Sequence, residues 1–402
     1  MNASSLNRFL PDLPSQPDTV LWVALAVIAA GLAGELLFRG LRLPRVTGYF
    51  LVGLLFSSWG LGFDPLSLPV NIRLVIDLAL AVLLFELGYR VDLRWLRANP
   101  WILLTSLAEA AASFAAVFAL LRLTGTDPTS ATAIAVVLMS TSPAVVMRVV
   151  SEFRASGQVT ERLLMLTALN AIYAVLGVKA LLGWLNHEGG GPALTALGYP
   201  LFVIAGSTLL GVALAFALRW TARHFDARED NAVLVLLGML LLALALVDKG
   251  RLSGLLTPLI AGMVLKMYSA RPLLLPRHFG TAGGVLVAAL FLCTGMAVSL
   301  QHFLAGGIVV VGLVAARALA KGVVGALLSW PSGLSAQQAF ALGLALTPAS
   351  GVAFLLTADL LTASPELAGH AGPIVYSAIA ILEFLGPLAV YWALHRSGET
   401  HV

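Results

Sequence analysis

The chain has 402 residues, of which 59% are hydrophobic and only 11% are charged. Soluble globular chains carry about 25% charged residues, so a soluble domain could not bury this much apolar surface. The composition excludes a soluble globular protein and predicts one that crosses a lipid bilayer several times.

A membrane-spanning helix needs about 20 mostly apolar residues, and the charged and Gly/Pro-rich breaks divide the chain into thirteen such segments. They are residues 19–38, 46–62, 71–90, 98–122, 130–152, 161–186, 197–222, 231–248, 251–268, 282–301, 305–329, 337–360 and 368–396. The second, eighth and ninth segments are the shortest. The apolar runs do not alternate with polar residues as barrel strands do, so we expect an all-α polytopic fold.

The distribution of basic residues predicts the orientation in the membrane. If the N-terminus lies outside, 16 of the 24 Lys and Arg residues fall in inner loops, five in outer loops and three within spans. Cytoplasmic loops carry an excess of Lys and Arg. The sequence therefore predicts a protein of the inner cell membrane with its N-terminus outside and its C-terminus in the cytoplasm. The net charge of +4 reflects this topology, and we expect no nucleic-acid partner.

Two of the expected spans are interrupted at their centres by proline and hydroxyl residues. Span 130–152 contains "STSP" at 140–143, and span 337–360 contains "TPASG" at 347–351. Proline removes a backbone donor and breaks a helix, and irregular backbone at membrane depth requires burial in protein or a wet cavity. A single kink would be ordinary, but a matched pair in corresponding positions favours the substrate site of a secondary transporter.

The spacing of the broken spans predicts an internal repeat. They are the fifth and twelfth spans, which divides a single transmembrane domain (1–402, without a soluble domain) into three parts. The first repeat covers about 19–186, a linking helix about 197–222, and the second repeat about 231–396. One linking span inverts the second six-helix repeat relative to the first.

Five segments in chain order resemble the cation:proton antiporter superfamily. They are "RGLRLPRVTGYFLVGLLFSSWGLG" (39–62), "LALAVLLFELGYRVDLRWLR" (78–97), "GRLSGLLTPLIAGMVL" (250–265), "FLCTGMAVSL" (291–300) and "LEFLGPLAVYWALHRSGE" (382–399). The resemblance implies the sodium/proton antiporter-like fold, in which two broken helices cross. It further implies elevator-like alternating access and a homodimer.

The sixth span departs from the family at the residue that usually carries the chemistry. The antiporters that the chain resembles have a pair ending in aspartate, and this aspartate binds the proton and the cation in competition. In "ALNAIYAVL", Asn170 occupies the first position and Ala171 the position of the aspartate, and no acid lies between Glu161 and Glu188. Since alanine can neither ionise nor bind a cation, another acidic residue would be needed for proton coupling.

Two glutamates within the spans are the proton-coupling candidates, because ionisable residues at membrane depth are usually functional and paired. Glu109 lies near the middle of the fourth span and is either the proton carrier or an ion-pair partner of Arg317 or Lys321. Glu86 lies in the inner third of the third span, where it is either a second carrier or reaches the inner interface.

Three basic residues within the spans are expected to compensate charge. Arg317 and Lys321 are four residues apart, hence on one helix face, and Lys179 can extend its ammonium toward the outer interface. With the usual acid absent, these residues allow a site that accepts an anion, especially beside the positive ends of half-helices.

Neutral polar residues near the breaks are the candidates for substrate binding. They are Thr141, Ser142, Asn170, Thr347 and Ser350. Their alternative role is to satisfy backbone groups that the broken helices leave without a partner.

The sequence therefore predicts a secondary transporter that resembles monovalent cation:proton antiporters. One alternative is a carrier of an anion or small polar solute with different or no proton coupling. The other is a transport-inactive membrane protein with a binding or regulatory role. The expected partners are membrane lipid, a small ion or solute, and a second copy of the chain. We expect no enzyme activity and no cofactor, and the seven histidines lack metal-ligand spacing, so no metal site is expected.

Overall fold

The computed structural model describes residues 19–57, 71–188, 193–224, 230–268, 279–298, 300–329 and 333–401, and over these ranges the regular structure is entirely helical. The helices are α2 (Thr19–Leu41), α3 (Arg45–Phe56), α4 (Asn71–Arg90), α5 (Leu93–Ala98), α6 (Pro100–Leu123), α7 (Pro128–Leu138), α8 (Pro143–Glu152), α9 (Gln158–Glu188), α10 (Ala193–His224), α11 (Asp230–Gly250), α12 (Leu256–Tyr268), α13 (Phe279–Met296), α14 (Leu300–Ser329), α15 (Ala336–Ala345), α16 (Gly351–Ala363), the 3-10 turn η2 (Pro365–Leu367) and α17 (Ala371–Arg396). Eight apolar segments of the described chain are long enough to cross a membrane. The all-α polytopic fold is confirmed, and the total of thirteen spans stays a prediction.

The ends of several helices differ from the expected spans. Helix α3 ends at Phe56, and the remainder of the expected span 46–62 lies mostly outside the described residues. Helix α12 begins at Leu256, five residues later than expected, because the preceding residues form a turn. The short helix α5 was not expected; the Asp92 side chain starts it by accepting hydrogen bonds from the backbone N–H groups of Arg94 and Trp95.

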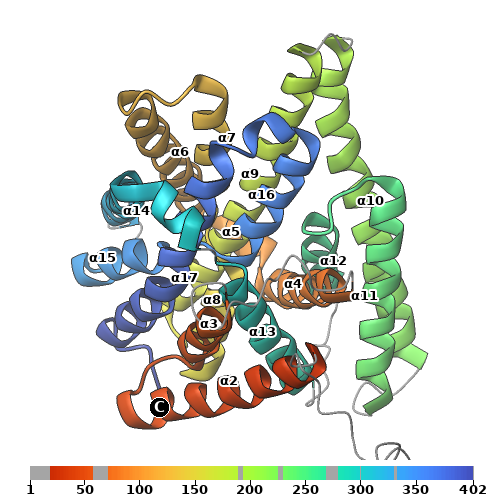
Figure 1. Cartoon of the computed structure of the whole chain (residues 1–402). Coiled ribbons are helices and arrows are strands. Elements are labelled where there is room, and N and C mark those ends of the chain that lie inside the picture. The colour runs from red at the N-terminus through yellow and green to blue at the C-terminus, as the bar shows by residue number, and fades with distance from the viewer. Residues whose placement is uncertain are drawn as a thin grey trace, which may run out of the picture.

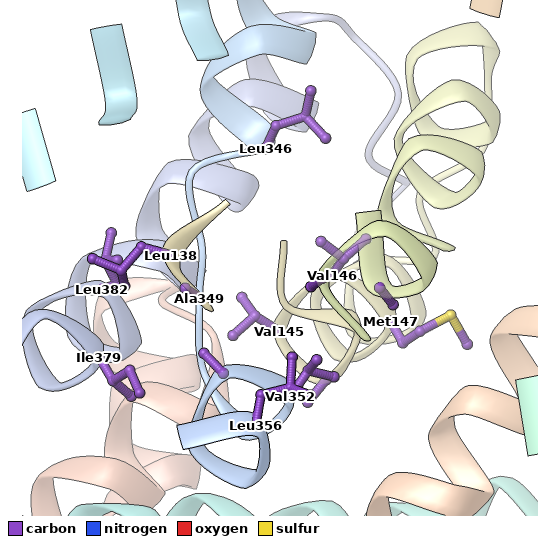
Figure 2. Packing of buried hydrophobic residues seen from close by; sticks show 14 of the residues in the cluster. Leu138, Val145, Val146, Met147, Leu346, Ala349, Val352, Leu356, Ile379 and Leu382 are labelled. Carbon is purple, nitrogen blue, oxygen red and sulfur yellow. The ribbon is translucent and has the colours of Figure 1, made fainter. Parts of the chain in front are cut away.

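Both expected breaks are present. Residues 139–142 separate α7 from α8, and residues 346–350 separate α15 from α16. The two connecting segments touch: the Ser142 N–H donates to the Pro348 carbonyl at 2.9 Å. Figure 2 shows Leu346 and Ala349 along the extended connection between α15 and α16, with Leu138 of α7 beside Ala349. We call this meeting point of the two connections the crossing.

The helices pack as two groups (Figure 1). The core group comprises α6 to α9 and α14 to α17, with close packing of α14 against α6, α15 and α17. The flanking group comprises α2 to α4 and α10 to α13, with α12 packed between α4 and α10, and α3 between α2 and α13. Helices α9 and α10 form the largest contact between the groups. Both broken helices belong to the core group.

Glycines bring α4 and α12 into backbone contact within the flanking group. A Cβ atom on Gly88 would lie 2.1 Å from the Leu259 carbonyl oxygen, and one on Gly262 would lie 2.2 Å from that of Phe85. We therefore expect Gly262→Ala to destabilise the protein by about 1–3 kcal/mol, since the two helices must separate. Thermal unfolding in detergent checks this. Gly238→Ala on α11 has no atom within 4 Å of the added methyl group and is the control; equal melting of the two variants would contradict the close packing.

The C-terminal segment fixes the start of α9, the helix that carries Asn170. The Glu399 carboxylate accepts hydrogen bonds from the backbone N–H groups of Val159 and Thr160, each at 2.8 Å, and from the Thr160 hydroxyl. These N–H groups belong to the first turn of a helix, which lacks internal acceptors. The side chain therefore caps α9 and holds it in the core group.

Candidate functional site

Arg317 is buried at the crossing and satisfies the carbonyl ends of both broken helices. Its guanidinium donates to the carbonyl of Leu138, the last residue of α7, at 2.5 Å and to the Ser140 carbonyl just after that helix at 2.6 Å. It also donates to the Thr347 carbonyl and, at 3.3 Å, to that of Pro348, after α15. Each helix C-terminus carries about half a negative charge. The single positive charge of Arg317 therefore offsets the two helix ends that meet there.

Glu109 and Lys321 form a fully buried ion pair next to Arg317. The Lys321 ammonium donates to Glu109 Oε2 at 2.6 Å, and both side chains are 0% exposed. The ammonium also donates to the Thr141 hydroxyl at 3.2 Å, which ties the pair to the broken helix. Of the two partners that the sequence left open for Glu109, the contact is with Lys321.

Asn170 and Thr141 complete the cluster around the Glu109 carboxylate. The Asn170 amide donates to Glu109 Oε1 and, at 3.0 Å, to the Thr141 hydroxyl. Thr141 in turn donates to the Leu346 carbonyl at 3.0 Å. The Asn170 side-chain oxygen is buried and has no hydrogen-bond partner in the described part of the chain. We refer to Glu109, Lys321, Asn170 and Thr141 together as the central cluster.

The other three hydroxyl candidates lie at the crossing and contact backbone or each other. Ser142 accepts from the Val145 N–H at 3.3 Å, and the Ser142 and Ser350 hydroxyls lie 2.5 Å apart. The Thr347 hydroxyl donates to the Leu344 carbonyl at 2.8 Å. These contacts satisfy freed backbone groups and link the two breaks, which was the alternative role considered for these residues.

Two of the remaining candidates lie apart from the central cluster. Glu86 is 20% exposed and pairs with Arg90 at 2.8 Å, one turn further along α4. None of its described contacts is with Glu109, Asn170 or the breaks, so the structure does not place it where a carrier would be needed. Lys179 pairs with Asp359 of α16 at 3.2 Å.

Ala171 is buried beside the central cluster, and Glu109 provides the carboxylate there from a different helix. Ala171 is 1% exposed on α9, whereas Glu109 projects from α6. Glu109 was predictable from the sequence, but the buried hydroxyl residues beside it on α6 were not among the predicted residues. Ser106 and Ser113 are buried on α6, three residues before and four residues after Glu109, so they lie on the same helix face. This polar stripe was visible in the sequence. The pairing of Asp359 with Lys179 had no comparable signal.

Two crossed, broken membrane helices with ionisable side chains at their crossing are the architecture of a secondary transporter. A family model described as "Sodium/hydrogen exchanger, transmembrane" matches residues 23–395. The chain therefore belongs to the sodium/hydrogen exchanger family, which is a family of transporters and not of enzymes. The superfamily expected from the sequence is confirmed.

The fold is similar to that of the sodium proton antiporter MjNhaP1 from Methanocaldococcus jannaschii. A structure of that protein at pH 8 superposes with a TM-score of 0.67 and 16% identity, covering 94% of this chain and 95% of that one. A structure from an electron-microscopy map gives a TM-score of 0.66 and 18% identity over the same shares of the two chains. No curated protein matches this chain. At these identities the likeness concerns the fold alone.

Proposed function

We propose that the protein exchanges a monovalent cation for a proton at the central cluster, with Glu109 as the ion-binding carboxylate. The observation that carries the proposal is the buried Glu109–Lys321 pair at the crossing, bonded to Asn170 and Thr141. Hard cations take oxygen ligands. The cluster offers the Glu109 carboxylate, the Thr141 hydroxyl and the Asn170 side-chain oxygen, which has no other described partner.

The charges of the central cluster give the exchange its stoichiometry. A cation bound to Glu109 displaces the Lys321 ammonium, which would then be a buried charge without a counterion. Such a charge is strongly unfavourable, so Lys321 releases its proton as the cation binds. Rebinding of a proton to Lys321 restores the ion pair and expels the cation. The charge of the cluster is the same in both states, because one proton replaces one monovalent cation.

The proposed movement is an elevator-like displacement of the core group against the flanking group. Its support is that α6, α9, α14 and the connection between α7 and α8, which carry the central cluster, all belong to the core group. The bound ion can therefore travel without a change in its ligands. We further propose the two inverted repeats (about 19–186 and 231–396, joined by 197–222), an inner-membrane location with the N-terminus outside, and a homodimer, as the sequence predicts.

A cavity at the expected outer end of the core group is the proposed access route. It has a volume of about 800 Å³, and its polar lining includes Thr129, Asn186, Tyr199, Arg251, Ser364 and Glu366. Gly183 of α9 and Ala363 of α16 also line it. Lys179 and Asp359 each lie four residues before these two positions, on the same helix faces. Their ion pair therefore lies directly beneath the cavity, between it and the crossing.

Lys179→Met is expected to lower the half-saturating cation concentration on the outer side by about three- to tenfold, because loss of the Lys179 ammonium makes the potential beneath the cavity more negative and attracts cations. The half-saturating cation concentration on the inner side should not change. Proton flux measured at varied cation concentration in vesicles of each orientation checks this. Lys266→Met, at the opposite end of the flanking group, is the control. An equal change on both sides would contradict the proposed route.

The proposed function is tested with purified protein in acid-loaded liposomes that contain a pH-sensitive dye. Addition of Na⁺, Li⁺ or K⁺ should make the interior alkaline, and choline should not. The N-terminus of α16 favours the alternative of an anion carrier, since Ser350 makes no side-chain capping bond there. Anion uptake without a cation response would favour that carrier, and silence in both assays would favour a transport-inactive protein.

A further inference from the structure

A second buried carboxyl group lies between the two helix groups, outside the central cluster. Glu383 of α17 is 1% exposed. Its Oε1 accepts a hydrogen bond at 2.7 Å from the hydroxyl of Thr294 on α13. Its Oε2 is buried and has no partner in the described ranges. Because α17 belongs to the core group and α13 to the flanking group, this hydrogen bond joins the two.

Contacts of neighbouring residues on α17 and α13 place the Glu383–Thr294 hydrogen bond close to the crossing. Gly386, three residues after Glu383, packs against Pro348, and a Cβ atom there would lie 2.8 Å from the Pro348 Cβ. Leu290, one turn before Thr294, lies next to Gly351 at the start of α16. Figure 2 shows Leu382 beside Leu138 and Ala349. Glu383 therefore approaches the crossing from α17, whereas Glu109 approaches from α6.

No described cation neutralises Glu383. The helices packed against α17 are α3, α7, α8, α13, α14, α15 and α16. Their charged groups bind elsewhere: Arg45 and Arg148 to Glu152, Lys321 to Glu109, Arg317 to carbonyls, and Asp359 to Lys179. The other titratable groups, which are Tyr49 on α3, Cys293 on α13, and Tyr376, Tyr391, His395 and Arg396 on α17, form no described hydrogen bond with it. An ionised carboxylate in this position is costly, whereas a protonated one is tolerated.

The Thr294 hydroxyl can serve both protonation states. It lies 2.7 Å from Glu383 Oε1 and 3.1 Å from the Phe291 carbonyl of its own helix, but it has a single hydrogen. When Glu383 is protonated, its O–H donates to Thr294, and Thr294 donates to Phe291. Every hydrogen then has an acceptor. When Glu383 is ionised, Thr294 must turn its hydrogen to the carboxylate, whose second oxygen still has no donor.

We propose that Glu383 is a proton-binding site that locks the core group to the flanking group. The protonated side chain closes the hydrogen-bond chain to Thr294 and Phe291 and holds the groups together. Loss of the proton leaves a carboxylate that needs water, so the α13–α17 junction opens and the core group can move. The site is separate from the central cluster, but its effect on transport depends on the proposed function.

Glu383→Gln tests the lock because glutamine is neutral at every pH and its amide can donate to Thr294 as the protonated acid does. At the pH where the wild type is fastest, cation-driven proton flux should fall at least about tenfold. The rise in rate on the acid side of the profile that Glu383 causes should be lost, which leaves only the pH dependence of proton exchange at Lys321. Hydrogen–deuterium exchange of α13 and α17, corrected for the intrinsic pH dependence of amide exchange, should rise with pH in the wild type and stay low in the variant. The exchange measurement requires no transport.

Thr294→Val should act in the opposite direction, because it removes the polar bond across the junction. The acid side of the activity profile should move by about one unit to lower pH. Glu161→Gln, at an exposed position on α9, is the control and should follow the wild-type profile. Wild-type transport with unchanged pH profiles in both junction variants would overturn the lock alone. Absence of wild-type transport would overturn the proposed function. Corrected hydrogen–deuterium exchange rates of α13 and α17 that do not change with pH would overturn the lock, whether or not transport is observed.

Discussion

Glu109→Gln is expected to reduce cation-driven proton flux by about a hundredfold or more, since it removes the only charged ligand of the proposed ion and leaves Lys321 buried without a counterion. The variant keeps the shape of the side chain and a hydrogen-bonding group for Asn170. A loss of flux in this variant is therefore caused by the loss of the Glu109 charge and not by a change in packing. The measurement is the dye assay in acid-loaded liposomes, with Glu161→Gln as the matched control at an exposed site.

Loss of the fold is a competing cause of such a result, and a second variant separates the two. Removing one partner of a buried ion pair costs about 3–5 kcal/mol, but replacing both partners is often neutral. Glu109→Gln combined with Lys321→Met should therefore melt near the wild-type temperature and still fail to transport. Activity in the double variant, or in Glu109→Gln alone, would show that the exchange takes place elsewhere.

Arg317→Ala is expected to have the largest effect on stability. The guanidinium donates to four carbonyl groups at the ends of α7 and α15, and at membrane depth water does not replace it. A hydrogen bond to a charged group contributes about 1.5–3 kcal/mol, so the variant should lose at least about 4 kcal/mol and yield little folded protein. Arg317→Lys should recover part of the lost stability, because an ammonium offers three hydrogen-bond donors but lacks the planar geometry of the guanidinium.

The measurement for Arg317 is thermal unfolding of the protein in detergent, followed by intrinsic fluorescence. Arg122→Ala is the control, since this exposed side chain donates to a single described carbonyl, that of Thr126. Its melting temperature should change little. A melting temperature for Arg317→Ala close to that of the wild type would contradict the role of the guanidinium in joining the two breaks.

The broken helices were predictable because proline and clustered hydroxyls interrupt long apolar runs, and both breaks lie where the sequence placed them. The role of Arg317 was only partly predictable. Its position four residues from Lys321 showed that both share a face, but not that one binds carbonyls and the other a carboxylate. That difference depends on the helix ends facing each residue, which are brought together from segments about two hundred residues apart in the chain.

The acid at the central cluster shows a further limit of sequence analysis. Comparison of the sixth span with the family pattern places Ala171 at the position of the usual aspartate, so this span supplies no carboxylate to the site. In the structure, the Glu109 carboxylate comes from α6 and reaches Asn170, the neighbour of Ala171. The sequence offered two glutamates within the spans, Glu109 and Glu86, and the packing of α6 against α9 and α14 shows that Glu109 is the one next to Asn170.

Proton release on cation binding tests the central claim most directly. Purified protein in weakly buffered detergent solution is titrated with Na⁺, Li⁺ and K⁺ while the pH is recorded. If Glu109 and Lys321 exchange partners as proposed, the wild type releases about one proton for each cation bound, and the variant with Glu109→Gln and Lys321→Met releases none. Equal release by that double variant, or cation binding by the wild type without any release, would contradict exchange at this ion pair.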